Sequence, residues 1–388
     1  MATASVGTAS APSKKKFRLF HLASGFDMPF LILLILLLAI GLVCMFSASY
    51  VYAGYYDDDS YFYIKKQVIF AIAGLVAMFL LSTVDYHVWH HLAFPLMLVS
   101  VVLLVITLFL PSSTGVHRWI EIPGLGQFQP SEVAKFALIV LFAHLISLNH
   151  KKMKTFTLGF LPFMGILGLV CGLVILEPHL SGTILILAIG IVMMYVGGTR
   201  VLYLVLTLLL GVAAVVFMVV FQGYEADRIY VWLHPLEAFE TMRDAAWQTV
   251  QSLYAIGSGG LMGVGLGNSR QKHLFLPEPQ NDFIFAIICE ELGFIGALVI
   301  ILLFALLVWR GILIGIKSPD KFGSMLAIGL SAQIGIQVVL NIAVVTNSMP
   351  NTGIGLPFFS YGGTSMLMLL AQMGILLSVS RQIKSKKE

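Results

Sequence analysis

Three carboxylates lie at the start of a long apolar run in the C-terminal half of the chain. In "LFLPEPQNDFIFAIICEELGFIGALVIILLFALLVWR", residues 274–310, Asp282 opens the run, and Glu290 and Glu291 follow about two helical turns later. An ionised side chain in hydrocarbon costs several kcal/mol unless it is paired or hydrated. Asp282 therefore has two compatible interpretations. It caps the helix that begins here, or it is a base at the outer rim of a polar cavity.

The two glutamates cannot both share a narrow helix face with Asp282. At about 100° per residue, Glu290 would lie about 80° from Asp282 and Glu291 about 180° away. Asp282 and Glu290 could then line one broad cavity, whereas Glu291 needs another partner. The alternative for both glutamates is a structural salt bridge or hydrogen bond between helices. No second acidic cluster has the spacing of a metal pair.

Basic residues accompany acids and aromatics in a second polar stretch. Arg118 and Trp119 have the composition of an interfacial anchor and equally of a cavity wall. Glu132 and Lys135 are three residues apart, so they share a helix face and can form an internal ion pair.

Two further segments are too polar for ordinary membrane spans. Glu177 and His179 bracket Pro178 between two apolar runs, where a broken helix is tolerated if it lines a cavity. "GLPFFSYGGTS", residues 355–365, has the composition of a re-entrant segment. Together with Arg118, Lys135 and Arg228, these segments predict a cavity for an anionic lipid that bears sugar or phosphate.

The composition places these residues in a membrane protein. The chain has 388 residues, of which 59% are hydrophobic and 11% charged, and its mean hydropathy is +0.94. Soluble domains have about 25% charged residues. Cys44, Cys171 and Cys289 all fall in apolar runs, which indicates packing residues and no disulfide framework.

Apolar runs long enough to cross a bilayer recur along the chain. We expect an all-α integral membrane protein with about ten transmembrane helices, near residues 28–49, 67–84, 93–110, 133–148, 158–176, 181–197, 201–221, 283–309, 323–346 and 361–380. An even number of spans places both termini on one side. With that side cytoplasmic, inner segments hold 15 of the 23 Lys and Arg residues and short outer segments hold four (residues 65, 66, 118 and 135).

This topology divides the chain into a tail and one domain. Residues 1–25 are small, polar and basic, and we expect a disordered cytoplasmic tail. Residues 26–388 form a single polytopic domain, with a large external loop at 222–282 between the seventh and eighth spans. The distinctive polar motifs all face outward.

Three of these motifs resemble the SEDS family (shape, elongation, division and sporulation), the FtsW/RodA/SpoVE polymerases of bacterial peptidoglycan. They are "GVHRWIEIPGLGQFQPSEVAK", "QSLYAIGSGGLMGVGLGNSRQKHLFLPEPQNDFIFAIICEELGFIG" and "PNTGIGLPFFSYGGTS", in family order and spacing. The wording around residues 267–286 is most similar to the FtsW/SpoVE branch. The chain departs from the family at 177–182, where "EPHLSG" replaces the common "QPDLG", and we expect Glu177 to take over the role of the usual acid.

The resemblance implies a peptidoglycan glycosyltransferase that polymerises lipid II outside the cytoplasmic membrane. It implies that Asp282 is catalytic and takes a proton from the acceptor hydroxyl in a single inverting transfer. The substrate-binding residues that we expect are Arg118, Trp119, Glu132, Lys135, Glu177, Arg228, Gln248, Ser258, Ser360, Tyr361, Gly362 and Gly363. The lipid diphosphate leaving group needs cationic stabilisation. The resemblance permits a divalent cation, Mg or Mn, which the sequence itself does not demonstrate.

The resemblance also implies partners and a location. These are lipid II, the nascent glycan strand, a class B penicillin-binding protein that crosslinks strands, other division or elongation proteins and membrane lipids, with no nucleic acid. The location is the bacterial cytoplasmic (inner) membrane at the division septum. Two alternatives stay open: a flippase for the lipid-linked precursor, and a division scaffold without chemistry of its own.

Overall fold

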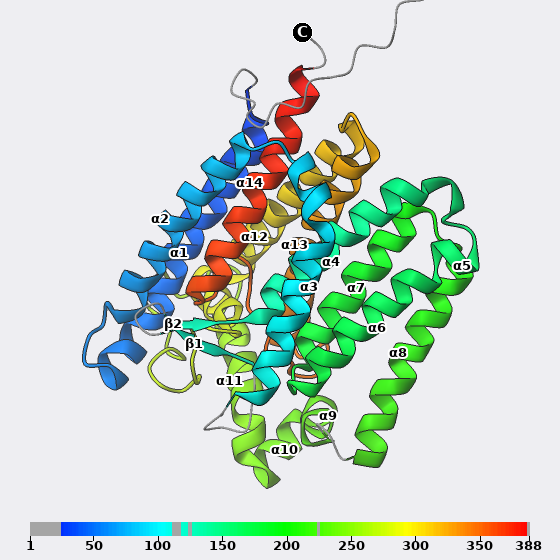
Figure 1. The fold of residues 1–388 in the computed structure, drawn as a ribbon. Helices are drawn as coiled ribbons and strands as arrows, with labels where there is room; N and C mark the ends of the chain where they lie inside the picture. The colour runs from blue at the N-terminus through cyan, green and yellow to red at the C-terminus, as the bar shows by residue number, and fades with distance from the viewer. Residues whose placement is uncertain (1–24, 111–117, 123–125, 223–225, 386–388) are drawn as a thin grey trace, which may run out of the picture.

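The computed structural model describes residues 25–110, 118–122, 126–222 and 226–385. The tail predicted at 1–25 therefore lies outside the described residues, apart from residue 25. The chain folds into a helix bundle in which the first helix begins, and the last helix ends, at the same end of the molecule (Figure 1). This arrangement agrees with the predicted placement of both termini on one side of a membrane.

Long helices occupy all ten predicted spans. Their bounds are α1 Met28–Tyr56, α2 Phe62–Thr83, α3 His87–Phe109, α4 Pro130–Asn149, α6 Leu161–Leu176, α7 Leu180–Gly197, α8 Val201–Gln222, α12 Ile284–Lys317, α13 Lys321–Val345 and α14 Gly363–Ser385. Among the described residues, nine helices are long and apolar enough to cross a membrane, and α8 contributes a shorter apolar stretch, Val201–Ala213. The all-α membrane fold is confirmed, while the count of ten spans stays a prediction.

The helix α4 lies at the centre of the bundle. About 72% of its apolar window is buried, against 22% for α2. It packs against α3, α7 and α13, and every residue from 133 to 143 is buried. A helix that is apolar all round belongs in the interior. The polar residues of its first two turns, Ser131, Glu132 and Lys135, are therefore held on a rigid element.

The helix α12 is broken near its outer end. Gly293 has φ 68° and ψ −173°, which interrupts the helical hydrogen bonds. The glycine-rich loop after α11 (Arg243–Gly259) restores them: the amides of Val264 and Gly265 donate to the carbonyls of Glu290 and Glu291, at 3.0 Å each. In return, the amide of Phe294 donates to the carbonyl of Gly260 at 2.9 Å. Backbone groups at membrane depth need such partners.

Glu290 and Glu291 hold the next part of the same loop. Glu290 accepts hydrogen bonds from the backbone amide of Arg270 at 2.9 Å and from the Ser269 hydroxyl. Glu291 forms a buried ion pair with Lys272 at 2.8 Å and accepts from the Ser47 hydroxyl at 2.7 Å. The structural interpretation of both glutamates is confirmed. The expectation that Glu290 lines a cavity with Asp282 is wrong, because Glu290 is buried against this loop.

The segments predicted to lie outside the membrane gather at the end opposite to the termini (Figure 1). About half of the predicted loop at 222–282 is helical, in α9 Ala226–Leu233, α10 Pro235–Thr241 and α11. A two-stranded antiparallel hairpin, β1 Ile120–Ile122 and β2 Gly126–Phe128, precedes α4. The links predicted to be cytoplasmic are short: η1 His150–Lys152 and α5 Phe156–Gly159 join α4 to α6.

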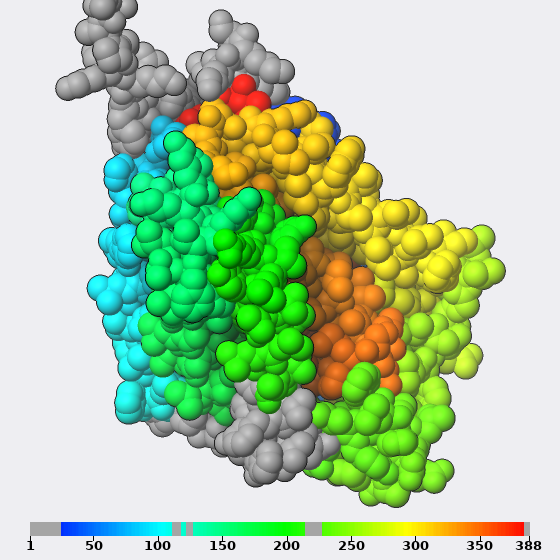
Figure 2. Space-filling view, turned by 90° about the vertical axis from the view of Figure 1, so that its right-hand side faces the viewer, coloured from blue at the N-terminus to red at the C-terminus, as the bar shows by residue number. Residues whose placement is uncertain are grey.

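The bundle is not evenly closed on its sides. In Figure 2, orange α13 surfaces between the green α7 and α8 and the yellow α12, and it is set back behind the green edge. The helix α8 packs along α7 and reaches α6 through the Thr207 hydroxyl, which donates to the Met164 sulfur at 3.3 Å. It stands apart from the rest of the bundle in Figure 1. The described part of the bundle is therefore most open on the side of α8.

Candidate active site

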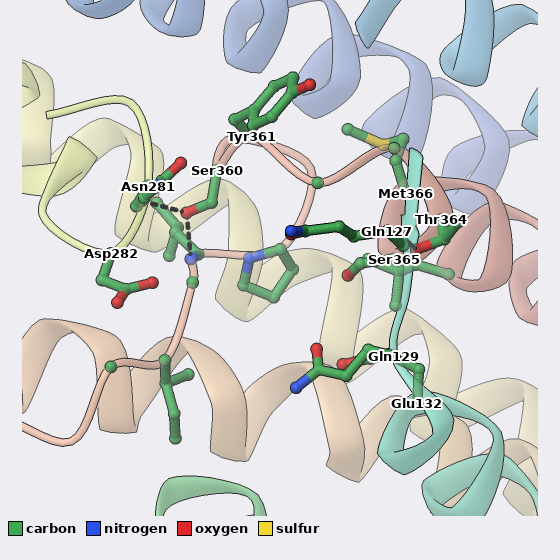
Figure 3. Close-up of a pocket in the computed structure, with 18 of the residues that line it drawn as sticks. Gln127, Gln129, Glu132, Asn281, Asp282, Ser360, Tyr361, Thr364, Ser365 and Met366 are labelled. Atoms are coloured by element: carbon green, nitrogen blue, oxygen red, sulfur yellow. Dashed lines mark hydrogen bonds between the residues drawn. The ribbon is translucent and has the colours of Figure 1, made fainter. Parts of the chain in front are cut away.

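A cavity of about 1370 Å³ lies at the end of the bundle opposite to the termini. Its lining comes from α2, the β-hairpin, α4, α7, α9, α11, α13, α14 and the irregular segment at 351–362. All the predicted site residues line this cavity except Glu177 and Ser258. Segments far apart in the sequence thus bring their polar residues to one place (Figure 3).

Asp282 stands at the edge of this cavity, just before α12. The residue that caps α12 is Phe283, and no side chain caps the helix by a hydrogen bond. The helix-cap interpretation of Asp282 is therefore wrong. Its side chain is half-buried and points toward the cavity (Figure 3). The cavity-rim interpretation agrees with this placement.

Two neighbours hold the backbone around Asp282. The side-chain amide of Asn341, on α13, donates to the carbonyl of Asp282 at 2.8 Å and to the carbonyl of Ile354 at 2.7 Å. Gly353 has φ +71°, and a β-carbon placed on it would lie 3.2 Å from Oδ2 of Asp282. The segment at 351–356 therefore passes directly beside the carboxylate, in a conformation that favours glycine.

The surroundings of Asp282 raise the pKa of its carboxyl group to about 6. Burial is the main cause, because it disfavours the charged form, and the neighbouring carboxylate of Glu278 adds to it. Arg118 and Arg228 act in the opposite direction. The carboxyl group is therefore mostly ionised at neutral pH but binds a proton more readily than an ordinary aspartate, which suits a general base.

The loop at 360–362 is attached to the segment that carries Asp282. The Ser360 hydroxyl donates to the carbonyl of Asn281 at 2.7 Å (Figure 3). The backbone amide of Tyr361 donates to the carbonyl of Gln280 at 2.8 Å. Gln67 of α2 accepts from the amide of Gly362 at 3.2 Å. Ser360 thus positions Asp282, while Tyr361, Gly362 and Gly363 form the adjoining wall.

Positive charge lies across the cavity. Lys135 forms an ion pair with Glu132 at 2.7 Å, as predicted from their spacing, and its side chain is only 4% exposed. Arg118 and Trp119, from the segment before β1, line the same cavity. Arg118 also donates from Nε to the carbonyl of Glu177 at 3.4 Å. An anionic group in the cavity would therefore meet two cations from two different elements.

The outer helices close the remaining side. Arg228 on α9 donates to the carbonyl of Asn351 at 3.2 Å, and the Asn351 side chain donates to Gln248 on α11 at 3.1 Å. Both Arg228 and Gln248 line the cavity, next to the segment that contains Gly353. Ser258 does not take part, because its hydroxyl donates to the carbonyl of Ala255 within α11.

These positions can be compared with known proteins. A sequence profile of the cell cycle protein family FtsW/RodA/SpoVE matches residues 28–385. The chain belongs to this family. Stage V sporulation protein E of Bacillus subtilis (strain 168) is 44% identical over 361 residues, which cover 92% of this chain and 97% of that protein. The probable peptidoglycan glycosyltransferase FtsW of Geobacter sp. (strain M18) is 39% identical over 364 residues, which cover 93% of this chain and 98% of that protein.

Solved structures agree with the FtsW/RodA/SpoVE assignment. A chain from a peptidoglycan synthase complex, studied for its coordination of polymerization and crosslinking, superposes with a TM-score of 0.75 at 26% identity, covering 94% of this chain and 99% of that chain. The rod shape determining protein RodA of Thermus thermophilus superposes with a TM-score of 0.68 at 26% identity, and the match covers 93% of this chain and 98% of that chain. The SEDS resemblance read from the motifs is confirmed.

Glu177 and His179 lie in the short segment that joins α6 to α7. Glu177 is fully buried beneath the cavity, where it accepts from the Thr107 hydroxyl at 2.5 Å. Its Oε2 has no hydrogen-bond partner within the described ranges. Burial raises the pKa of Glu177 to about 7, whereas burial, Arg118 and Lys135 lower the pKa of His179 to about 3. His179, and not Glu177, lines the cavity.

Sequence reasoning missed several residues of this FtsW/RodA/SpoVE site. Asn341 lies in an apolar span that also contains Gln333 and Gln337, and Gln67 opens the predicted second span directly after Lys65 and Lys66, so neither residue stood out. Gly353 lies within the motif "PNTGIG", and Glu278 lies four residues before Asp282. Their roles depend on contacts between distant segments, which spacing along one segment does not reveal.

Proposed function

We propose that this chain is a peptidoglycan glycosyltransferase that polymerises lipid II into glycan strands for cell division or a related wall-building process. Its relatives include proteins named as probable peptidoglycan glycosyltransferases, and its fold matches a chain of a peptidoglycan synthase complex. The observation that carries the proposal is the placement of Asp282. A carboxylate with a raised pKa faces a large polar cavity that contains cations.

The proposed reaction needs one base. The acceptor sugar's 4-hydroxyl oxygen forms a bond to the donor's anomeric carbon, its proton passes to the Asp282 carboxylate, and the bond from that carbon to the diphosphate oxygen breaks. The diphosphate leaves on the lipid with the bonding electron pair. One displacement inverts the α-linked donor into a β-linkage, so no second nucleophilic carboxylate is required.

The cations of the cavity suit the leaving group. Arg118, Lys135 and Arg228 all line the cavity that Asp282 faces. Charge develops on the diphosphate oxygens as the bond breaks, and fixed cations stabilise that charge more in the transition state than in the ground state. Because Lys135 is paired with Glu132, its ammonium group is held in place before substrate arrives.

A divalent cation fits the residues beside Asp282. Among the residues that the structure describes, no three His, Cys, Asp or Glu side chains are grouped to hold a metal. Mg²⁺, however, binds through one or two carboxylates together with water and substrate phosphates. Asp282 and Glu278 are the carboxylates that would hold it, and the buried Asn281 Oδ1 and Thr352 Oγ1 have no hydrogen-bond partner in the described structure. Such an ion would neutralise part of the diphosphate charge.

The proposed setting is the bacterial cytoplasmic (inner) membrane, with the cavity facing outward, at the division septum. The bias of Lys and Arg toward the end that carries both termini supports this orientation. Proposed partners are lipid II, the nascent strand, a class B penicillin-binding protein, other division or elongation proteins and membrane lipids. The match to a synthase that couples polymerization with crosslinking supports the penicillin-binding protein.

Purified protein supplied with labelled lipid II, with and without a cognate transpeptidase, tests this function. We expect glycan polymer from the wild type and none from Asp282→Asn, which keeps the size of the side chain but removes the base. Both proteins should insert and unfold alike. Precursor flipping in liposomes without any polymer would replace the enzyme with a transporter. Normal polymer from Asp282→Asn would remove Asp282 from the mechanism.

A further inference from the structure

Tyrosines concentrate at the outer hairpin between α1 and α2. Six of the 13 tyrosines of the chain lie at positions 50–63. This hairpin lies at the same end of the molecule as the β-hairpin and α9–α11 (Figure 1). The proposed reaction uses none of these six residues, so their clustering requires a separate explanation.

Five tyrosine rings form a continuous run. Tyr361 contacts Tyr63 edge-on, with ring centroids 4.8 Å apart, and Tyr63 lies 6.2 Å from Tyr52. Tyr52 lies 4.5 Å from Tyr56, which lies 4.9 Å from Tyr55. We call these five residues the tyrosine strip. Aromatic pairs at such centroid distances are favourable contacts, so the rings support one another.

One end of the tyrosine strip is in the candidate active site. Tyr361 lines the cavity, and its backbone amide is bonded to the segment that ends in Asp282. The other end is open, because Tyr55 and Tyr56 are 66% and 62% exposed. The strip therefore leads from the cavity wall to the surface.

The open end lies beyond the hydrocarbon. The helix α1 has 29 residues, which span about 43 Å at 1.5 Å per residue, whereas the hydrocarbon core is about 30 Å thick. Asp57, Asp58 and Asp59 follow directly. Asp58 is exposed, whereas Asp57 Oδ2 is buried and Asp59 is paired with Lys65 at 2.7 Å. The exposed tyrosine rings therefore lie beside the exposed carboxylate of Asp58.

We propose that the tyrosine strip binds the glycan strand as it leaves the cavity, an inference that rests on the proposed polymerase function. Aromatic faces carry partial negative charge, and the axial C–H groups of a β-linked pyranose present a complementary, weakly positive face. A sugar hydroxyl would donate to the exposed carboxylate of Asp58. A glycan strand repeats the same pyranose unit, so several tyrosine rings in a row can each contact one sugar. A single lipid anchor would contact only one ring.

The competing explanation is an interfacial aromatic belt, since tyrosines are enriched at membrane surfaces. Tyrosines of an aromatic belt contact lipid head groups individually. They need neither contact with one another nor a connection to a cavity. The two explanations differ in what a soluble sugar does. A glycan chain without lipid binds the tyrosine strip but has no affinity for a belt.

The test measures binding of short, peptide-free β-1,4-linked glycan chains to the full-length protein in detergent. We expect Tyr55→Ala/Tyr56→Ala to lose about tenfold or more in affinity, by comparison with base stacking on aromatic side chains. Tyr55→Phe/Tyr56→Phe should retain most of it, because stacking needs the ring. The matched control is Tyr195→Ala on α7, which removes a tyrosine of similar exposure, 61%, outside the strip.

Polymerisation provides the second measurement. In the Ala double variant we expect the initial rate of polymerisation to be unchanged and the strands to become shorter, because the product is released earlier. Saturation transfer from the tyrosine rings to the sugar in wild-type protein gives a readout that does not depend on folding of any variant.

Three outcomes would overturn the inference: equal glycan affinity in the Ala double variant and the wild type, an equal loss in Tyr195→Ala, or a change confined to insertion and thermal stability, which would identify a belt. A wild type that binds glycan but makes no polymer would contradict the proposed function instead, so the two failures are distinguishable.

Discussion

Gly353 and Asp282 are 71 positions apart in the sequence, yet a β-carbon on Gly353 would lie 3.2 Å from the Asp282 carboxylate. The backbone of the 351–356 segment therefore forms part of the immediate environment of the proposed base. The positive φ of Gly353 and the lack of a side chain are both needed for this approach.

Gly353→Ala tests that relationship. We expect loss of about 1–2 kcal/mol in the free energy of unfolding, because an L-residue is strained at this φ, and a fall of about tenfold or more in polymerisation rate, because the base is displaced. Thermal unfolding and the lipid II assay measure the two effects. Gly165→Ala on α6, where a β-carbon meets nothing within 4 Å, is the control. Equal behaviour of the two variants would contradict the positioning role.

The pH dependence of the rate should show an acidic limb near pH 6. Asp282 acts as a base only when ionised, so kcat/KM should rise as pH increases through its pKa of about 6. Because Glu278 raises this pKa and Arg228 lowers it, Glu278→Gln should move the limb to lower pH and Arg228→Gln to higher pH. Shifts of both variants in one direction would exclude this electrostatic account.

Removing the Lys272 ammonium group should unfold the outer part of the protein. Its ion pair with Glu291 is almost fully buried, with side-chain exposures of 5% and 2%. Lys272→Met leaves a buried charge without its partner, and we expect a loss of roughly 3–5 kcal/mol, measured by thermal or denaturant unfolding in detergent. The exposed pair between Lys65 and Asp59 is the control, and Lys65→Met should cause no measurable loss. A similar loss of stability in Lys272→Met and Lys65→Met would show that burial of the ion pair does not determine its contribution.

Glu177 predicts a stability that falls as pH rises. Its pKa is raised from 4.5 to about 7 in the folded protein, so between these values the folded state binds more protons than the unfolded state, and stability decreases with increasing pH. Glu177→Gln should remove this slope and be more stable above pH 7 by roughly 1–3 kcal/mol. Unfolding midpoints measured from pH 4 to 8 would show it. An unchanged slope in the variant would mean that Glu177 is ionised in the fold.

The helices were predictable because each apolar run is long and its flanking residues are polar. The β-hairpin at 120–128 was not, since its strands have only three residues each in a region of glycine and proline. The break in α12 was also missed, because Gly293 lies inside an apolar run that reads as one continuous span. Its interruption depends on the loop at 260–265, whose amides replace the lost helical bonds.

The sequence predicted which residues belong to the candidate site better than it predicted how those residues contact one another. Asp282, Arg118 and Lys135 were visible as charges in outward-facing segments, and topology brings such segments to one end. The contact between Gly353 and Asp282, and the bond from Asn341 to the Asp282 carbonyl, depend on tertiary packing of separate elements. Glu290 shows the converse error: helical periodicity placed it near the cavity, but a loop covers it.

The exchange of hydrogen bonds at Gly293 joins α11 and the outer end of α12 into one mechanical unit. Separating them would expose several amides and carbonyls to hydrocarbon, so a tilt of either segment is transmitted to the other. Asp282 lies at the tip of that unit. A protein that binds only α9–α11, without entering the cavity, could therefore change the distance between the proposed base and the sugar.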